Sequence, residues 1–297
     1  MIRAVALLFA LTSCVSSGAE ETETSPFIDA SVQEQPASIG FFLTELDASL
    51  RVWSNLRNSA TSHQDLRTLR TLERELTQRT AKRQADLEDQ LQSPSPKNRQ
   101  VAVIALGFTG DLEVMGSLTL ALTDRNPAVV QNALLGLGIL AAPDTPLAPL
   151  CSILGSDAEA RTRNNAAFAM LAVVSAGGRD ECVVPSCRAA LIDPAPGVRV
   201  QVVSVLGTLV DPGSIETLGD LLYDEIDLVA HAAAAALGNI GRKSLPDKGR
   251  VGRLFISCLE RVEPRLERRI FDELARMSEV NYGDDVELWT EWAFRLP

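Results

Sequence analysis

The chain has 297 residues, of which 46% are hydrophobic and 23% charged, and its net charge is −11 at pH 7. It is long enough to bury a large core. The acidic balance argues against general nucleic-acid binding, because such binding draws most of its affinity from lysine and arginine side chains on phosphates. We therefore expect cationic or neutral partners and no nucleic acid.

The first residues, MIRAVALLFALTSC, contain one arginine, an apolar run and then small residues before Cys14. This pattern predicts a secretory signal that is too short to span a bilayer as a mature helix. Its end, Leu11-Thr12-Ser13-Cys14, resembles the bacterial lipobox. The resemblance implies a signal peptide over residues 1–13 and an acylated Cys14 that anchors the mature chain. An ordinary signal peptide with an incidental cysteine is the alternative.

The residues after the cysteine suggest where the protein is held. In proteins that this leader resembles, aspartate directly after the acylated cysteine marks retention in the inner membrane. Val15 stands at that position, so the outer membrane, facing the periplasm of a bacterial cell envelope, is favoured. Residues 14–37 are polar and acidic, which predicts a disordered linker attached to the lipid. We expect contact with the membrane through the lipid anchor only.

Residues 38–93 are predicted to form an N-terminal helical hairpin that caps the following repeats. Apolar residues at helical spacing indicate one helix from Ser38 to about Arg57. A second helix is expected from Ser62 to the Ser93-Pro94-Ser95-Pro96 stop. A solenoid needs such a cap because the first true repeat would otherwise expose its apolar side.

One side of the second predicted helix is basic. It carries Arg67, Arg70, Arg74, Arg79, Lys82 and Arg83. We expect a solvated face with Glu73 and Glu75 as local partners. Contact with anionic lipid or with an acidic partner is the alternative.

Residues 94–261 contain five copies of a two-helix unit. Shifting the sequence by 100 positions places Arg199 to Asp224 on Arg99 to Asp124 without a gap. The copies share leucine landmarks at intervals of 31, 34, 35 and 31 residues: Leu106, Leu137, Leu171, Leu206 and Leu237. A period of this size predicts an all-α fold, an α-solenoid of helical hairpins.

Small residues recur four positions before each landmark leucine. They are Ala102, Ala133, Ala167, Val202 and Ala233. Their spacing places them on the buried stripe of the first helix, where small side chains let neighbouring helices approach closely. Pro127 and Pro196 stand just ahead of their helices, where the first turn tolerates proline.

These patterns resemble HEAT repeats from about Pro96 to Glu260. The likeness is carried by Pro-x-Val-x-x-x-Ala-Leu-x-Gly-Leu-Gly from Pro127 to Gly138 and by Gly197-Val198-Arg199. The resemblance implies a curved scaffold whose concave face, formed by the second helices, holds other proteins.

HEAT repeats, which these patterns resemble, favour an arginine early in each first helix. It is matched by Arg99 and Arg199, and by Arg163 one position early. Val130 and Ala230 replace it in the second and fifth copies, so the resemblance implies that part of the usual arginine and aspartate ladder is missing there.

The second helices supply the candidate partner-binding residues. These are Glu113, Glu216, Asp220, Arg250 and Arg253, which face an unidentified protein on the concave side in this hypothesis. Ordinary solvated surface is the alternative for each of them.

Residues 262–297 are predicted to form a divergent helical pair. Trp289 and Trp292 share one helix face in a tail that resembles a closing element of bacterial HEAT proteins. We expect a C-terminal cap, with a carbohydrate or ligand platform as the alternative.

Four cysteines follow Cys14, and an oxidising compartment would allow some of them to pair. Cys182 and Cys187 flank a loop that enters a helix, where they could join, and we hypothesise one disulfide within the trio Cys151, Cys182 and Cys187. Cys151 is a rival partner because alignment of the repeats places it beside Cys187. Buried free thiols are the alternative to any disulfide.

No catalytic or metal-binding pattern stands out. His63 and His231 are the two histidines, and no spacing typical of a zinc site or a phosphate-binding loop occurs. We therefore predict a non-enzymatic, lipid-tethered interaction scaffold without cofactor or metal. The alternative is a HEAT-like lyase or chaperone, similar to bilin lyases, that binds a small ligand on its concave face.

Overall fold

The computed structural model describes residues 38–59, 62–156 and 158–297, and no strand occurs among them. The all-α solenoid class predicted from the sequence is confirmed by this architecture. The signal peptide, acylated Cys14 and acidic linker predicted for residues 1–37 lie outside the described residues. Within the described ranges, no helix combines the length and the apolar character needed to cross a membrane.

Helix pairs in chain order make up the fold. Three helices come first: α1 (Ile39–Ser59), α2 (His63–Ala81) and α3 (Gln84–Gln90). The first helices of the five repeats are α4 (Pro96–Leu106), α6 (Pro127–Leu140), α8 (Ala160–Ser175), α10 (Pro196–Leu209) and α12 (Asp227–Lys243). The second helices are α5 (Met115–Leu120), α7 (Ala148–Leu154), α9 (Val183–Ala189), α11 (Ile215–Asp220) and α13 (Leu245–Cys258).

Short 3₁₀ segments flank several second helices. They are η1 (Leu112–Val114), η2 (Ala121–Thr123), η3 (Ala190–Ile192), η4 (Pro212–Ser214), η5 (Leu221–Tyr223) and η6 (Leu259–Arg261). The chain closes with α14 (Pro264–Ser278) and α15 (Val286–Phe294).

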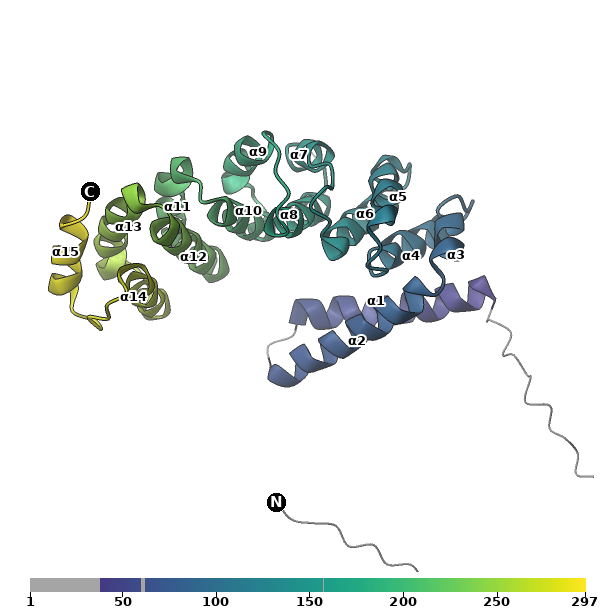
Figure 1. Ribbon diagram of the computed structural model, residues 1–297, viewed down its shortest axis with the longest axis horizontal. Coiled ribbons are helices and arrows are strands. Elements are labelled where there is room, and N and C mark those ends of the chain that lie inside the picture. The colour runs from purple at the N-terminus through teal and green to yellow at the C-terminus, as the bar shows by residue number, and fades with distance from the viewer. Residues whose placement is uncertain (1–37, 60–61, 157) are drawn as a thin grey trace, which may run out of the picture. The chain divides into compact units, whose positions relative to one another are not determined.

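The first helices stack on one another in chain order, from α4 through α6, α8, α10 and α12 to α14 (Figure 1). Each second helix packs against the first helix of the following unit. The small residues predicted for the stacking stripe are fully buried: Ala102, Ala133, Ala167, Val202 and Ala233. The apolar stripe that recurs in each first helix is therefore buried by the packing of each hairpin on the next.

Glycine permits the closest approaches between first helices. A Cβ atom on Gly107 of α4 would lie 2.5 Å from the carbonyl oxygen of Gly136 on α6. The equivalent contact joins α10 and α12, where a Cβ on Gly207 would lie 2.7 Å from the Cβ of Ala236. A larger side chain at Gly107 or Gly207 would force the stacked helices apart.

The second helix of the N-terminal hairpin is shorter than predicted. It ends at Ala81, and the chain turns at Lys82 and Arg83 before α3 begins. The Arg83 guanidinium donates to Asp86 over 2.6 Å, and the turn lets α3 pack against α4 with Leu87 fully buried. Burial of α3 on the first repeat therefore outweighs continuation of a helix that contains no proline or glycine at this point.

The α1–α2 hairpin packs against the layer of first helices. The Trp53 and Phe108 rings meet edge to face with centroids 5.2 Å apart, and the Arg57 guanidinium lies 3.7 Å from the centre of the Phe168 ring on α8. Glu73 of α2 accepts a hydrogen bond from the Trp53 indole over 3.1 Å. The hairpin thus contacts more than the first repeat, while α3 covers the start of α4.

The C-terminal pair packs on the last repeat. Trp289 is fully buried, and its indole donates to the carbonyl of Gly283 over 3.0 Å. Its ring meets Tyr282 and Trp292 edge to face, with centroids 4.8 and 5.8 Å away. α15 contacts α13, so the aromatic cluster covers apolar surface that the last repeat would otherwise expose.

Candidate functional site

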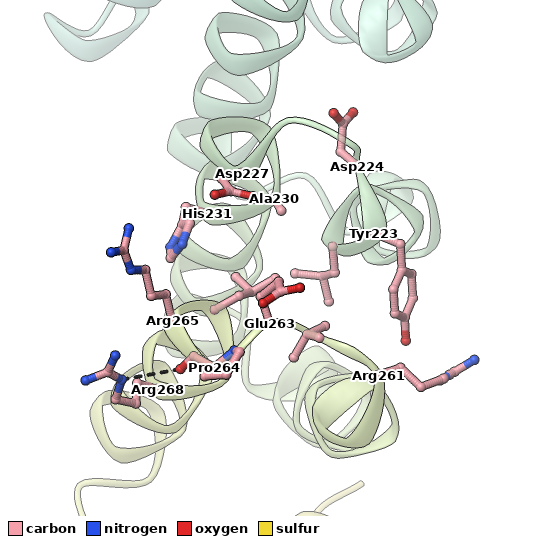
Figure 2. Close-up of a pocket in the computed structure, with 13 residues that line it drawn as sticks. Tyr223, Asp224, Asp227, Ala230, His231, Arg261, Glu263, Pro264, Arg265 and Arg268 are labelled. Carbon is pink, nitrogen blue, oxygen red and sulfur yellow. Dashed lines mark hydrogen bonds between the residues drawn. The ribbon is translucent and has the colours of Figure 1, made fainter.

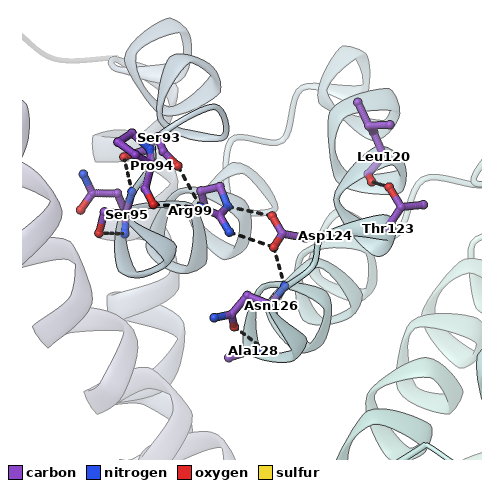
Figure 3. A network of polar contacts seen from close by, with 10 residues as sticks. Ser93, Pro94, Ser95, Arg99, Leu120, Thr123, Asp124, Asn126 and Ala128 are labelled. Carbon is purple, nitrogen blue, oxygen red and sulfur yellow. Dashed lines mark hydrogen bonds and ion pairs between the residues drawn. The ribbon is translucent and has the colours of Figure 1, made fainter.

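In the first, third and fourth repeats, largely buried arginine and aspartate side chains join the first helix to the loop that leaves the same repeat. Arg99 donates to both carboxylate oxygens of Asp124, over 2.7 and 3.0 Å (Figure 3). The same carboxylate accepts from the backbone amide of Asn126, which caps α6. The hydrogen bond from Arg99 holds the pKa of Asp124 below its ordinary value. We call such a pair a clamp, because it ties one repeat to the start of the next.

Two further clamps follow the same plan. Arg199 donates to both oxygens of Asp224 over 2.9 and 2.8 Å, and Arg163 donates to Asp193 over 2.7 and 2.9 Å. The fifth repeat has Ala230 at the clamp position, and its methyl group cannot reach the following loop. The clamp is therefore absent from the fifth repeat, as the missing arginine predicted.

A cleft of about 720 Å³ lies beside Ala230, where the fifth repeat has no clamp arginine (Figure 2). We call it the C-terminal cleft. Its lining comes from η5, the start of α12, the loop after η6 and the start of α14: Leu222, Tyr223, Asp224, Asp227, Ala230, His231, Arg261, Val262, Glu263, Pro264, Arg265, Leu266 and Arg268.

Charges of both signs line the C-terminal cleft. Asp224 is held by Arg199, and Arg268 donates to the carbonyl of Pro264 over 3.3 Å. The side chains of Asp227 and Glu263 form no hydrogen bond or ion pair with the residues that the structure describes. Figure 2 shows Glu263 extending into the space between α12 and η5. This carboxylate is placed to receive a donor from a bound molecule.

The cleft also exposes apolar surface. Tyr223 is 46% exposed, and the Arg261 guanidinium lies 5.1 Å from the centre of its ring. Ile226 and Leu228, in the next few residues, are exposed as well. Exposed apolar groups beside charged groups are typical of protein interaction surfaces. No group of histidine, cysteine and carboxylate side chains suited to a metal ion occurs in the described ranges.

The five residues proposed from the sequence do not form one cluster of free charges. Glu216 of α11 accepts a hydrogen bond from Arg250 of α13 over 2.8 Å, so these two charges neutralise each other between neighbouring repeats. Arg253 donates to the carbonyls of Ala293 and Leu296, which ties α13 to the C-terminal segment.

The other two candidates are exposed carboxylates. Glu113 lies on η1 and Asp220 ends α11, and neither side chain has an ion-pair partner in the part of the chain that the structure covers. Asp220 is three residues from Tyr223 in sequence, whereas Glu113 lies in the first repeat. Only Asp220 is therefore a neighbour of the cleft in sequence.

One disulfide lies within the trio Cys151, Cys182 and Cys187, as hypothesised, but it does not join Cys182 to Cys187. Cys182 pairs instead with Cys151, the rival partner, and Cys187 is a buried free thiol. Cys182 stands at the start of α9, whereas Cys187 lies in the helix and faces Met170 of α8, with the two sulfur atoms 3.4 Å apart. Burial raises the pKa of Cys187 to about 12, and that of the free thiol Cys258 to about 11.

Comparisons with known proteins agree on the architecture. Residues 85–171 match the family model for HEAT repeats. The fold is that of a HEAT-repeat solenoid. Among solved structures, a mutant of Kap121p is 14% identical with a TM-score of 0.58, and the alignment covers 86% of this chain and 30% of that chain.

An engineered protein is similar to this HEAT-repeat solenoid as well. It is 17% identical with a TM-score of 0.52, covering 85% of this chain and 72% of that chain. No curated protein matches the chain. Identities this low show the fold alone.

The sequence analysis missed the C-terminal cleft, although one signal for it was present. Ala230 interrupts the arginine ladder in the sequence, but nothing in the sequence shows that the loop at Val262 and Glu263 lies opposite it. Nothing in the sequence indicated that Tyr223 lines a cleft. Only the stacking of α12 and α14 brings these residues together.

Proposed function

We propose that the protein is a non-enzymatic interaction scaffold that holds a segment of a partner protein in the C-terminal cleft. The observation that carries the proposal is the C-terminal cleft itself, where the exposed ring of Tyr223 lies near the carboxylates of Asp227 and Glu263, which form no ion pair among the described residues. In the first, third and fourth repeats the equivalent position is filled by an arginine–aspartate pair.

The lining of the cleft favours a polypeptide over a small molecule. Small-ligand sites bury most of the ligand surface between predominantly apolar walls. Here Arg261, Glu263, Pro264, Arg265 and Arg268 line the cleft while being exposed themselves. An extended segment could lay one apolar side chain on Tyr223 and still leave its other side in water.

Charge indicates what the partner carries. The protein has a net charge of −11, and Asp227 and Glu263 hold carboxylates without an ion pair among the described residues. A basic residue next to an apolar one in the partner would satisfy Glu263 and contact Tyr223. Complementary charge of this kind mainly raises the association rate and the specificity.

Affinity purification from detergent-solubilised membranes tests this function. The wild-type protein should retain a partner that is lost with Glu263→Lys and with Tyr223→Ala. Glu225→Lys is the matched control, because Glu225 is exposed, lies outside the cleft lining and gives the same change in charge. Retention of the partner by the two cleft variants overturns the proposal, and a small molecule in the purified complex favours the lyase or chaperone alternative.

We also propose that an acylated Cys14 tethers this scaffold to a bacterial envelope membrane. The support is the lipobox-like end of the apolar leader. Two acyl chains bury enough methylene groups for stable anchoring, at about 0.8 kcal/mol for each methylene. Metabolic labelling with a fatty acid should mark the wild-type protein and not Cys14→Ala. Equal labelling of both, or membrane fractionation unchanged by Cys14→Ala, contradicts the tether.

A further inference from the structure

One face of α2 is a line of exposed cations. Arg67, Arg70 and Arg74 are exposed on it, and Lys82, also exposed, follows directly after the last residue of the helix. At about 100° per residue, these four positions fall on one side of the helix, opposite Leu76, which is buried against the rest of the hairpin. We call these four residues the α2 basic stripe.

The acidic partners expected for this stripe are not available to it. Glu73 turns inward and accepts the hydrogen bond from the Trp53 indole. Glu75 forms no ion pair among the described residues. Among the described residues, the only hydrogen bond of a stripe side chain is donated by Arg67 to the neutral side chain of Gln64, over 2.6 Å. The face is exposed to solvent, as expected, but Glu73 and Glu75 form no ion pair with its cations among the described residues.

The other two basic residues predicted for this face are used inside the fold. Arg79 donates to Ser49 over 3.2 Å and pairs with Glu45 of α1, and Arg83 pairs with Asp86. Two of the six predicted basic residues therefore form contacts within the fold, and the other four are exposed.

The spacing of the stripe is unfavourable for the isolated helix. Arg67 and Arg70 are three residues apart, and Arg70 and Arg74 are four apart, so neighbouring turns carry like charges. Each such pair destabilises a helix by about 0.2 to 0.5 kcal/mol. Attraction between these arginines and an anionic surface would offset the repulsion among them. The remainder of the chain is acidic overall, which makes the stripe an exception in its charge.

We propose that the α2 basic stripe contacts an anionic phospholipid surface. Its three arginines lie along one 19-residue helix and Lys82 follows at the end of that helix, and the four residues line neither the C-terminal cleft nor the clefts beside Trp53 and Phe168. A straight line of charge without a hollow is complementary to a planar array of phosphates, whereas a folded acidic partner needs shape complementarity as well.

The inference extends the proposed tether, on which it rests for its location in the cell. The described structure begins at Ser38, which is 24 residues after Cys14. Even a fully extended chain of that length spans only about 80 Å, so an acylated Cys14 would keep α2 near the bilayer. The stripe would then set which side of the scaffold faces the lipid.

Vesicle co-sedimentation of the full chain carrying Cys14→Ala tests the stripe without a contribution from acylation. The probes are vesicles of phosphatidylcholine alone and vesicles that also contain phosphatidylglycerol. The protein should bind the anionic vesicles more tightly, and added salt should weaken the binding. Any attachment through the apolar leader appears with both vesicle types and is subtracted.

A triple variant, Arg67→Gln with Arg70→Gln and Arg74→Gln, should lower binding to the anionic vesicles about a hundredfold, since each basic residue near such a surface contributes about 1 kcal/mol. The control replaces three exposed cations elsewhere by glutamine, at Arg125, Lys243 and Arg265, and should leave the binding within about threefold.

Two results would overturn the inference. One is equal binding to the two kinds of vesicle, and the other is an equal loss of binding in the stripe and control variants. Neither result affects the tether, which fatty-acid labelling of the wild-type protein tests separately. Urea unfolding of both triple variants confirms that each is folded, because all six side chains are exposed.

Discussion

Arg199 and Asp224 are joined by two parallel hydrogen bonds, and they reproduce the geometry of Arg99 and Asp124 one hundred residues earlier. The likeness extends to the backbone. The remaining guanidinium nitrogen, Nη1, donates to the carbonyl of Asp193 in Arg199 and to the carbonyl of Ser93 in Arg99. The clamp thus recurs in three of the five repeats, and of the two residues that replace its arginine, Val130 and Ala230, Ala230 lines the C-terminal cleft.

Removing one partner of a clamp should be costly. Arg199→Met leaves the Asp224 carboxylate with little access to water and without its guanidinium, so we expect the free energy of unfolding to fall by about 3 kcal/mol. Urea denaturation followed by circular dichroism measures the loss. Arg125→Met, at an exposed arginine that forms no ion pair in the described ranges, should change stability by less than about 0.5 kcal/mol. Equal effects of the two substitutions would rule out a structural role for the clamp.

The clamps should make stability fall in acid. Hydrogen bonding from Arg99 lowers the pKa of Asp124. At Asp193 and Asp224 burial alone would raise the pKa, but the arginine hydrogen bonds outweigh it and the net shift is downward. Because the folded pKa lies below the unfolded value of about 3.9, each carboxylate stabilises the fold above about pH 4. That contribution is lost as the pH falls through the folded pKa.

The measurement is the urea midpoint at a series of pH values between neutrality and strong acid. The wild-type midpoint should fall below about pH 4, and Asp224→Asn should start lower and fall less steeply. A variant curve parallel to that of the wild-type protein would show that Asp224 contributes nothing to the acid sensitivity.

Stacking of the first helices should be sensitive to one methyl group. Gly107→Ala places a carbon 2.5 Å from a carbonyl oxygen on α6, and we expect a destabilisation of about 1 to 3 kcal/mol. Gly116→Ala is the matched control. Its Cβ would meet no atom within 4 Å, so alanine should stabilise α5 by about 0.5 to 1 kcal/mol. Thermal unfolding of both variants distinguishes them, and a stabilised Gly107→Ala would contradict the close packing of α4 and α6.

The disulfide should stabilise the middle repeats. Cys151 and Cys182 are 31 residues apart, and closing a loop of this size stabilises a protein by about 3 to 4 kcal/mol in the chain-entropy model. Cys182→Ser should lose this stability and become insensitive to reductant. Peptide mapping without reduction should give one linked peptide that contains both cysteines. Release of the peptide that carries Cys151 without reduction would contradict the Cys151–Cys182 disulfide.

Much of the fold followed from burial patterns that repeat along the chain. The landmark leucines and the small residues four positions earlier predicted the stacked first helices, because only one arrangement buries them all. The turn at Lys82 was missed because no proline or glycine marks it. It depends on the packing of Leu87 against α4, which is a tertiary effect.

The sites were harder to predict because they depend on pairs of distant residues. Cys182 and Cys187 are close in sequence, but Cys187 points into the core, and the Cα atom of Cys151 lies 6.3 Å from that of Cys182. Glu216 and Arg250 looked like free surface charges until the stacking of α11 and α13 paired them. Sequence reasoning placed these residues on the correct helices without their partners.

Site-specific photocrosslinking in cells tests the proposed scaffold most directly. A photoreactive residue at Tyr223 should form one discrete adduct with a protein, and Glu263→Lys in the same chain should abolish it. The same residue at Leu112, which is exposed on η1 far along the chain, should not form that adduct. No discrete protein adduct from Tyr223, or the same adduct from both positions, would contradict a partner held in the C-terminal cleft.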